Sequence, residues 1–390
     1  MSKKNIVSFI AGMAVMGVIG VGINGVTGSN AVSSSRLGER YEKIEKKLDT
    51  IDKTISDYYL NQDDIDLDQL EEGIYAGYVD GLDENYTTYY TAEEFADVME
   101  ASSGSYSGIG AYVSQNMNTG IITIVKPFEG SPAEKAGIQK EDILYKVEGE
   151  EVTGQDLTTV VARLKGEEGT MANITIYRQS EDKYIDLSVE RAVVNVPTVA
   201  HQMLDNHIGY IQIAEFEEVT AEQFKEAVSD LQEQGMEKLI FDLRDNGGGL
   251  LDSVCDVLDT ILPKMMLVYT EDKDGNRREE WAEDDEAVDL PMAVLINGNT
   301  ASASEIFTGA LKDYDKAEII GTTSYGKGIV QSIIPFSDGS ALKVTSSKYY
   351  TPSGICIHGV GIEPDQTVEY DRTLEYDNQL QAAIDYLNEK

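Results

Sequence analysis

The chain has 390 residues, of which 41% are hydrophobic and 26% charged. That composition is typical of a globular protein and leaves room for two or three domains with substantial cores. The formal net charge of -39 argues against nucleic acid or an anionic membrane surface as an electrostatic partner. Two cysteines and three histidines, without the spacing of a disulfide or zinc framework, predict no metal site.

The first 30 residues predict a membrane anchor or a signal segment. Lys3 and Lys4 precede an apolar span, residues 6–26, that is about long enough to cross a bilayer. The lysines should stay in the cytoplasm, which places the rest of the chain outside it. The small residues at 28–35 also suit a cleavage site. An uncleaved anchor in the cell membrane and a cleaved signal peptide therefore both remain open.

Two helices are predicted within residues 36–95. In the first, apolar residues repeat at alternating steps of four and three, at Leu37, Tyr41, Ile44, Leu48, Ile51, Ile55 and Tyr58. Such a heptad seam is typical of a coiled coil, but an amphipathic helix packed on its own protein fits a seam of this length equally well. The second helix, residues 66–80, is the candidate partner within the chain. We therefore expect either intrachain packing or a homodimer through the N-terminal helices.

Residues 96–191 have the pattern of a small β-rich domain, with short alternating segments separated by glycine and aspartate. The predicted strands are 110–113, 121–125, 143–147, 174–177 and 184–189, and the predicted helices are 132–136 and 157–164. With the run Gly108-Ile109-Gly110 and the string GSPAEKAGI at 130–138, this pattern resembles a PDZ domain. The resemblance implies that Gly108, Ile109 and Gly110 present N–H groups to a peptide carboxylate, while the peptide adds a strand beside them.

From residue 192 onward, buried strands alternate with amphipathic helices, which predicts a mixed sheet covered by helices. Strands are expected at 208–213, 238–243 and 292–296, and helices at 250–262 and after residue 220. Thr220 and Gln223 have the spacing of a capping box. The glycines at 247–249 stand between a strand and a helix, where the backbone can approach a ligand closely. Their spacing differs from the dinucleotide fingerprint, which argues against a nucleotide site.

Two potentially reactive side chains lie in the next stretch. Ser302 follows the strand 292–296 and precedes residues with helical spacing, so it lies on a strand-to-helix turn. There the free N–H groups of the helix start can point at the space beside the hydroxyl. Lys327 lies on a glycine-flanked turn before the apolar strand 329–334. A lysine can act as the base that such a serine needs if burial lowers its pKa toward neutrality.

The string TASASE at 300–305, with Lys327 25 residues after Ser302 and Gln331 four further on, resembles the catalytic core of the C-terminal processing peptidases. These tail-specific serine proteases of peptidase family S41 combine a PDZ domain with a Ser-Lys dyad. The resemblance implies that Ser302 is the nucleophile, Lys327 the base and Gln331 the residue that orients the lysine. Ser304 is the neighbouring serine with which the nucleophile must not be confused.

The same resemblance assigns further residues. It implies that the N–H groups of Gly248 and Ala303 form the oxyanion hole. Lys165 takes the place of a basic residue that reports peptide binding to the active site, with Arg163 as the competing candidate. Glu84 follows Leu-Asp where the family has a proline. The resemblance covers about residues 36–370.

The sequence as a whole predicts an α+β multidomain protein. Its parts are a membrane helix or signal segment at 1–30, a helical pair at 36–95, a PDZ-like β-rich domain at 96–191, a mixed α/β protease core at 192–370 and a C-terminal helix at 371–390. The predicted function is that of a membrane-anchored, extracytoplasmic serine endopeptidase that binds the C-termini of protein or peptide substrates and needs no cofactor. The rival prediction is a catalytically silent PDZ scaffold, against which the intact Ser302, Lys327 and Gln331 argue.

Overall fold

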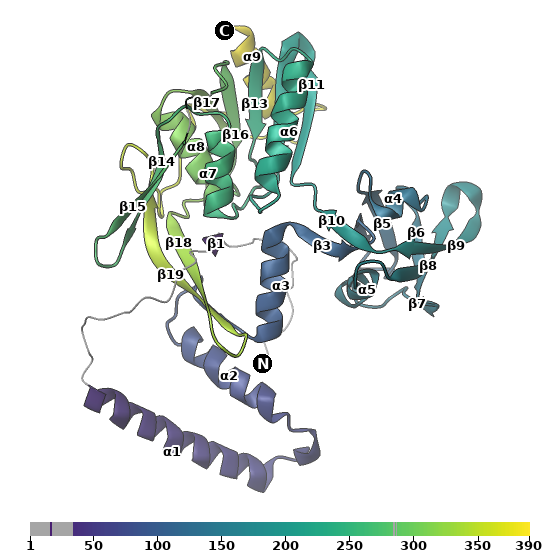
Figure 1. Ribbon diagram of the computed structural model, residues 1–390, viewed down its shortest axis with the longest axis vertical. Helices are drawn as coiled ribbons and strands as arrows, with labels where there is room; N and C mark the ends of the chain where they lie inside the picture. The colour runs from purple at the N-terminus through teal and green to yellow at the C-terminus, as the bar shows by residue number, and fades with distance from the viewer. Residues whose placement is uncertain (1–15, 18–33, 284, 286) are drawn as a thin grey trace.

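The computed structural model describes residues 16–17, 34–283, 285 and 287–390 (Figure 1). Most of the predicted membrane segment, residues 1–30, therefore lies outside the described residues. Its two described residues form the short strand β1 (Met16–Gly17), which pairs in parallel with strand β18 (Ile329–Pro335), so these two positions are extended and not helical. None of the helices in the described ranges combines the length and the apolar character that a bilayer crossing needs.

The predicted N-terminal helices are confirmed as α1 (Ser34–Tyr58) and α2 (Leu67–Asp80). Asp66 caps α2 by accepting a hydrogen bond from the Gln69 N–H. The two helices meet where the Arg40 guanidinium lies 5.4 Å from the centre of the Tyr78 ring. Both still expose apolar side chains, namely Tyr41, Ile51, Leu67, Leu70, Ile74 and Tyr78. The predicted seam is therefore only partly covered in a single chain.

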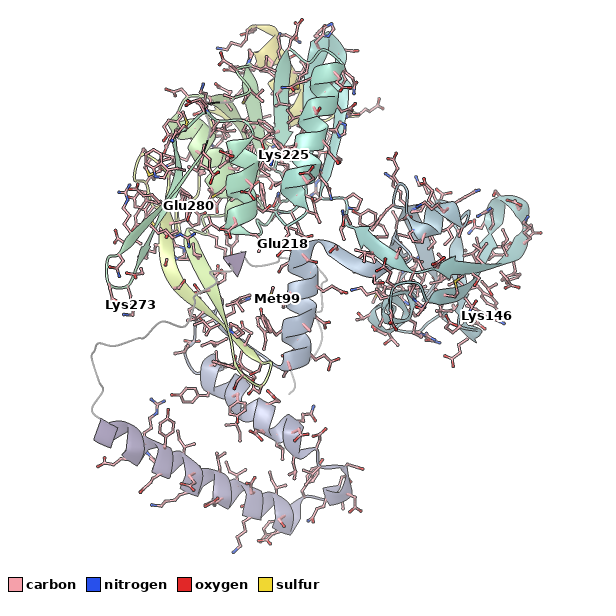
Figure 2. All side chains as sticks on the ribbon, in the orientation of Figure 1. Met99, Lys146, Glu218, Lys225, Lys273 and Glu280 are labelled. Atoms are coloured by element: carbon pink, nitrogen blue, oxygen red, sulfur yellow. The ribbon has the colours of Figure 1, made fainter. Side chains whose placement is uncertain are left out.

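Helix α3 (Ala92–Ser103) connects the N-terminal helices to the rest of the molecule (Figure 1). At its end, the Glu218 N–H donates to the Ser102 carbonyl at 3.1 Å, and Figure 2 shows Glu218 above this end, with Met99 further down the same helix. After α3, strand β3 (Ser105–Gly108) pairs antiparallel with β10 (Ala192–Asn195). The chain thus enters and leaves the next domain on two adjacent strands.

Between β3 and β10 lies a β-rich domain in which all predicted strands and helices are confirmed within a few residues. Its antiparallel sheet has the order β4-β5-β6-β8-β9, with β7 beside β6. The elements are β4 (Ala111–Gln115), β5 (Ile122–Pro127), α4 (Pro132–Lys135), β6 (Ile143–Val147), β7 (Glu150–Glu151), α5 (Leu157–Leu164), β8 (Met171–Arg178) and β9 (Lys183–Glu190). Alternate strand residues such as Ile122, Ile124 and Ile176 fill one core with Val160 of α5, which explains the period of two in the sequence.

The protease core is a mixed sheet with the order β11-β12-β13-β16-β17-β20, and β11 alone pairs antiparallel with its neighbour along this order. Its strands are β11 (Val199–Leu204), β12 (Ile208–Ile213), β13 (Lys238–Asp242), β16 (Met292–Ile296), β17 (Ala317–Gly321) and β20 (Gln366–Thr367). One face is covered by α6 (Thr220–Glu233), α7 (Leu251–Asp259) and α8 (Ala303–Asp313), the other by α9 (Asn378–Asn388). Because both faces are buried, the central strands are unbroken apolar runs.

A second sheet lies beside this core and carries the strand that follows Lys327. Its order is β1-β18-β19-β14-β15, and β2 pairs with β19 outside this order. The strands not yet given are β2 (Thr88–Tyr90), β14 (Met266–Asp272), β15 (Arg277–Trp281) and β19 (Ala341–Tyr350). Because β2 belongs to the N-terminal region, this pairing fixes that region against the last quarter of the chain.

The predicted capping box of Thr220 and Gln223 at the start of α6 is wrong. Thr220 is the first residue of α6, and the N-cap residue Val219 makes no side-chain cap. The Thr220 hydroxyl donates instead to the Glu215 carbonyl at 3.0 Å, and Gln223 Oε1 accepts from the Thr198 N–H at 2.9 Å. These two side chains hold the incoming loop and strand, so the capping-box spacing has another cause here.

Candidate active site

Ser302 lies on the turn between β16 and α8, as predicted. Its backbone has φ 63° and ψ -115°, a combination that non-glycine residues seldom adopt and that costs about 1–3 kcal/mol. Neighbouring bonds maintain it: the Thr300 hydroxyl donates to the Leu243 carbonyl at 2.8 Å, and the Tyr349 hydroxyl donates to the Ser302 carbonyl at 3.0 Å. The Ser302 Oγ is buried and has no hydrogen-bond partner among the described residues. The predicted nucleophile is thus held in place with its hydroxyl unengaged within the described residues.

Glu305 joins the serine turn to the lysine turn, a role that the sequence analysis missed. Its fully buried carboxylate accepts hydrogen bonds from the N–H groups of Ser302 at 2.8 Å, Gly326 at 2.8 Å and Lys327 at 2.9 Å, and from the Ser324 hydroxyl at 2.5 Å. Bonds to a charged acceptor are stronger than neutral ones. The available signal was an acidic residue three positions after Ser302, where a capping box places it.

Lys327 has the environment that a lysine base needs. Its side chain is buried, and its Nζ lies 4.7 Å from the centre of the Tyr86 ring. The pKa of Lys327 is lowered to about 8, first by burial and second by the charge of Lys343, against the raising effects of Glu305 and Glu84. A substantial fraction of this amine is therefore neutral near physiological pH.

The structure brings the two predicted dyad residues to the same carboxylate without a hydrogen bond between their side chains. Both are held by Glu305, yet Ser302 Oγ has no partner among the described residues, so no hydrogen bond connects it to Lys327. Gln331 on β18 donates from Nε2 to Thr345 Oγ1 at 3.5 Å, and its Oε1 is buried without a partner in the described part of the chain. Ser302 Oγ and Gln331 Oε1 are thus both available to a lysine amine. Free enzymes often show such loose catalytic geometry before substrate binds.

Gly248 and Ala303 flank Ser302, as an oxyanion hole requires. A Cβ built on Gly248 would lie 2.9 Å from the Ser302 Cβ and 3.0 Å from the Ala303 nitrogen. The Ala303 N–H meets no acceptor within the described residues. The Gly248 N–H, however, donates to Asn246 Oδ1 at 2.8 Å. An oxyanion at this position must therefore displace the Asn246 side chain or use a neighbouring N–H.

Replacing Gly248 by alanine is expected to slow the acylation of Ser302 by at least about tenfold, because its φ is 111° and the added Cβ would press on Ser302 and Ala303. The rate of labelling by a fluorophosphonate measures this effect, and the melting temperature checks the fold. Gly247→Ala is the matched control, since a Cβ there meets no atom within 4 Å. Equal labelling rates in the two variants would show that Gly248 does not shape the site.

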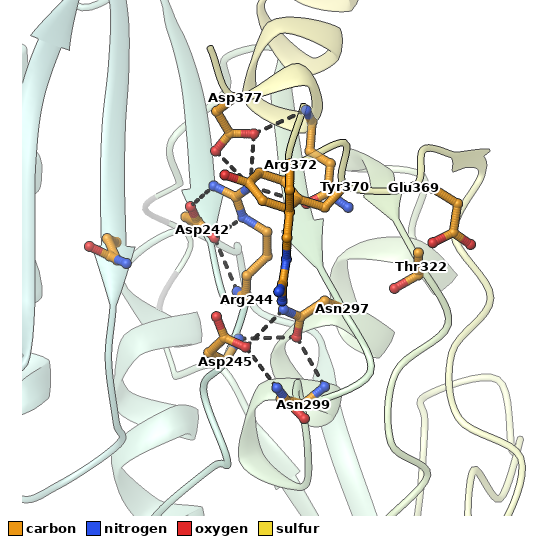
Figure 3. A pocket seen from close by; sticks show the side chains of 12 residues that line it. Asp242, Arg244, Asp245, Asn297, Asn299, Thr322, Glu369, Tyr370, Arg372 and Asp377 are labelled. Atoms are coloured by element: carbon orange, nitrogen blue, oxygen red, sulfur yellow. Dashed lines mark hydrogen bonds and ion pairs between the residues drawn. The ribbon is translucent and has the colours of Figure 1, made fainter. Parts of the chain in front are cut away.

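A polar pocket on the α9 side of the sheet supports the same two loops (Figure 3). Asp245, in the loop of Gly248, accepts hydrogen bonds from the Nδ2 groups of Asn297 at 3.0 Å and Asn299 at 2.8 Å. These bonds lower the pKa of Asp245 and keep it charged. The two asparagines belong to the turn that leads to Ser302, so the pocket ties the glycine loop to this turn.

The predicted peptide-binding residues lie where the chain enters the β-rich domain. Gly108 ends β3, Ile109 is buried in the domain core, and Gly110, with φ 77°, directly precedes β4. Gly110 also has no room for a side chain, since a Cβ there would lie 2.6 Å from the Ser131 Cβ. Binding of a peptide carboxylate by this loop stays a prediction.

Lys165 lies at the contact between the β-rich domain and α3. It forms an ion pair with Glu100 of α3, and its Nζ lies 5.1 Å from the centre of the Tyr106 ring. The competing candidate, Arg163, pairs with Glu150 of its own domain at 2.9 Å. Of the two, only Lys165 is paired with a residue outside the β-rich domain among the described residues, and its role in reporting peptide binding stays a prediction.

Known proteins resemble the chain over most of its length. Peptidase family S41 matches residues 207–368, and the PDZ domain family matches residues 123–178. The chain is 37% identical over 347 residues to the probable CtpA-like serine protease of Staphylococcus aureus (strain COL), which covers 88% of this chain and 67% of that protein. It is 37% identical over 349 residues to the carboxy-terminal processing protease CtpA of Bacillus subtilis (strain 168). This match covers 88% of this chain and 73% of that protein.

A solved structure with related sequence is that of the Photosystem II D1 C-terminal processing protease. It is 28% identical at a TM-score of 0.48, over 80% of this chain and 85% of that chain. The family match, the PDZ match and the curated relatives agree with the catalytic string at 300–305. The chain belongs to peptidase family S41 and is a serine peptidase of the C-terminal processing type that carries a PDZ domain.

Proposed function

We propose that this peptidase is anchored in the cell membrane, acts outside the cytoplasm, recognises substrate C-termini at its PDZ domain and cleaves through a Ser-Lys acyl-enzyme. The observation that carries the mechanism is the joint placement of Ser302 and Lys327. Both are buried, both donate their backbone N–H to Glu305, and burial lowers the pKa of Lys327 to about 8. The anchor is supported by the apolar span at residues 6–26 behind two lysines.

The proposed reaction is acyl transfer in two steps. Ser302 Oγ attacks the scissile carbonyl carbon while neutral Lys327 takes its proton, and the oxyanion binds at Ala303 and the glycine loop. Lys327 then gives the proton to the leaving amine as the C–N bond breaks. Water attacks the resulting ester with the same lysine as base, which releases the new C-terminus and restores Ser302. Gln331 Oε1, a buried and unengaged acceptor, orients the lysine amine.

Tail recognition is tested by separating binding from chemistry. Residues 31–390 should cleave an unstructured protein that ends in apolar residues, and should cleave the same protein with a charged end poorly. A free peptide with the apolar tail should inhibit this cleavage far more than it slows fluorophosphonate labelling of Ser302. Absence of any cleavage would favour the PDZ scaffold, and equal cleavage of both substrates would refute tail recognition. Equal loss of cleavage and labelling after deletion of residues 106–190 would indicate that the PDZ domain also assembles the active site.

A homodimer through the N-terminal helices is proposed from the partly exposed seam on α1. Ile44 and Leu48 are half-buried and Ile51 is exposed in the single chain, and each side chain that a partner covers contributes roughly 1.5–3 kcal/mol. Replacing these three residues by aspartate should convert residues 31–390 from dimer to monomer in sedimentation. A wild-type fragment that stays monomeric at tens of micromolar in about 0.15 M salt, where charge repulsion is screened beyond about 8 Å, would contradict the dimer.

A further inference from the structure

A short segment of the N-terminal region, residues 84–87, lies against the catalytic residues. It directly precedes β2, whose pairing with β19 brings it to the second sheet. The Thr345 N–H donates to Thr87 Oγ1 at 3.2 Å, and Thr345 Oγ1 donates to Glu84 Oε2 at 3.1 Å. Tyr86 lies between these two contacts and faces Lys327. The segment therefore touches the lysine directly and Gln331 through one residue.

The direct contact is between Tyr86 and Lys327. The separation of 4.7 Å between Nζ and the ring centre is typical of cation–π attraction, which favours the charged ammonium. The Tyr86 hydroxyl is hydrogen-bonded to Tyr325, two residues before the lysine, which holds the ring in place. Ser302 Oγ and Gln331 Oε1 meanwhile have no partners within the described residues. The amine thus lies against the ring, while neither of the two groups that it must reach in catalysis is hydrogen-bonded to it.

The indirect contact runs from Glu84 through Thr345 to Gln331. Burial alone would raise the pKa of Glu84, but hydrogen bonds from Thr87, Tyr86 and Thr345 outweigh it and lower that pKa. The carboxylate is therefore charged and can only accept, so Thr345 donates its hydroxyl proton to it. The same hydroxyl can then only accept from Gln331, which fixes Nε2 toward Thr345 and leaves Oε1 as the free acceptor.

We propose that residues 84–87 control the position and the protonation of the catalytic lysine. This inference rests on the Ser-Lys mechanism proposed above. In the resting enzyme the Tyr86 ring binds the protonated amine of Lys327; we call this ring the resting seat. Glu84 is a positioning residue: it keeps Gln331 Oε1 oriented to accept a hydrogen bond from the amine in its productive position. The other charged groups that act on Lys327 are Lys343 on β19 and Glu305 on α8, and both stay unchanged in the variants below.

Tyr86→Leu in the full chain tests the seat. Without the ring the ammonium loses stabilisation, so the midpoint of the pH profile of fluorophosphonate labelling should fall by about 0.5–1 unit. Tyr86→Phe keeps the ring and should keep the midpoint. Tyr89→Leu removes a ring that contacts Tyr75 of α2 instead, and so controls for loosening of the region. If the midpoint of the pH profile is unchanged or higher in a folded Tyr86→Leu variant, Tyr86 does not stabilise the protonated lysine and its proposed role is refuted.

Thr345→Val tests the chain of hydrogen bonds, because it removes the hydroxyl with little change in shape. The loss of a fixed amide at Gln331 should lower kcat about tenfold and leave KM close to the wild-type value. Thr345→Ser restores a hydroxyl and should recover most of the rate. If valine and serine variants match the wild type, Glu84 does not act on Gln331. If both variants lose the same activity, the effect is one of packing and the positioning role is refuted.

Ser302→Ala and Lys327→Ala separate this inference from the mechanism beneath it. If either variant still cleaves the tailed substrate, the Ser-Lys mechanism fails and the role of residues 84–87 fails with it. If both variants are inactive while the Tyr86 and Thr345 variants behave as the wild type, the mechanism stands and the control by residues 84–87 is refuted.

Discussion

Ser302→Ala and Lys327→Ala are each expected to lower cleavage by roughly four orders of magnitude or more, because they remove the nucleophile and its base. Both variants should keep the wild-type melting temperature to within a few degrees, since Ser302 Oγ makes no hydrogen bond in the described structure and an alanine at 327 buries no charge. Cleavage of a tailed protein substrate and thermal unfolding, measured on the same preparations, check the two expectations.

Ser304→Ala is the matched control for the nucleophile. The Ser304 hydroxyl donates to the Asn246 carbonyl at 3.1 Å, so its removal should cost about 1 kcal/mol of stability and leave substantial activity. An inactive Ser304 variant beside an active Ser302 variant would show that the nucleophile has been placed two residues too early.

The pH profile of the wild-type enzyme tests the role of Lys327 as the base. Because the proposed mechanism uses neutral Lys327 as the base and the pKa of this lysine is lowered to about 8, kcat/KM should rise with pH and level off above that value. Below it, the ammonium cannot take the serine proton. A histidine base would place the limb near 6.5 instead, and a limb at that position would contradict a lysine base.

Glu305→Gln is expected to lower the free energy of unfolding by about 3 kcal/mol or more and to abolish activity. Each carboxylate oxygen accepts two hydrogen bonds. Oε1 accepts from Ser324 and Gly326, and Oε2 accepts from Ser302 and Lys327. Whichever way the amide is turned, its NH₂ group faces two of these donors. Denaturant unfolding and fluorophosphonate labelling measure the two losses.

Ser324→Ala provides a graded comparison for Glu305. It removes one of the four donors and should cost only about 1–2 kcal/mol, with labelling slowed less than in the glutamine variant. A glutamine variant that is as stable and as reactive as the wild type would show that the two turns do not depend on this carboxylate.

Much of the core was predictable because the pattern of apolar residues along the sequence indicates which faces of a strand are buried. The strand expected at 292–296 coincides with β16, a continuous apolar run because both faces of this parallel strand are buried. The alternating strand expected at 208–213 coincides with β12, in which Tyr210 and Gln212 are less buried than the isoleucines around them. The turn that bears Ser302 followed from the change between strand and helix periodicity. The position of the lysine was readable only from the resemblance, because nothing local in the string GKG marks it as buried.

The remaining features depend on contacts between distant residues or on competition between local ones. Thr220 and Gln223 have capping-box spacing but bind a loop and a strand, because tertiary acceptors compete with the helix end for the same side chains. Gly248, the predicted oxyanion-hole residue, lies beside Ser302, but its N–H donates to Asn246, which spacing alone does not reveal. The approach of Tyr86 to Lys327 depends on the pairing of β2 with β19, and no periodicity in either strand predicts that partner.

The pairing of β2 with β19 also sets an order of events during synthesis. Thr87 and Thr345, which are hydrogen-bonded beside this pairing, are 258 residues apart, so β2 emerges from the ribosome long before its partner exists. Such a distant contact forms late, once the cost of closing the intervening loop is met. A nascent chain consequently cannot place Tyr86 against Lys327 until most of its length has been made, so the surroundings of this lysine are completed only late in synthesis.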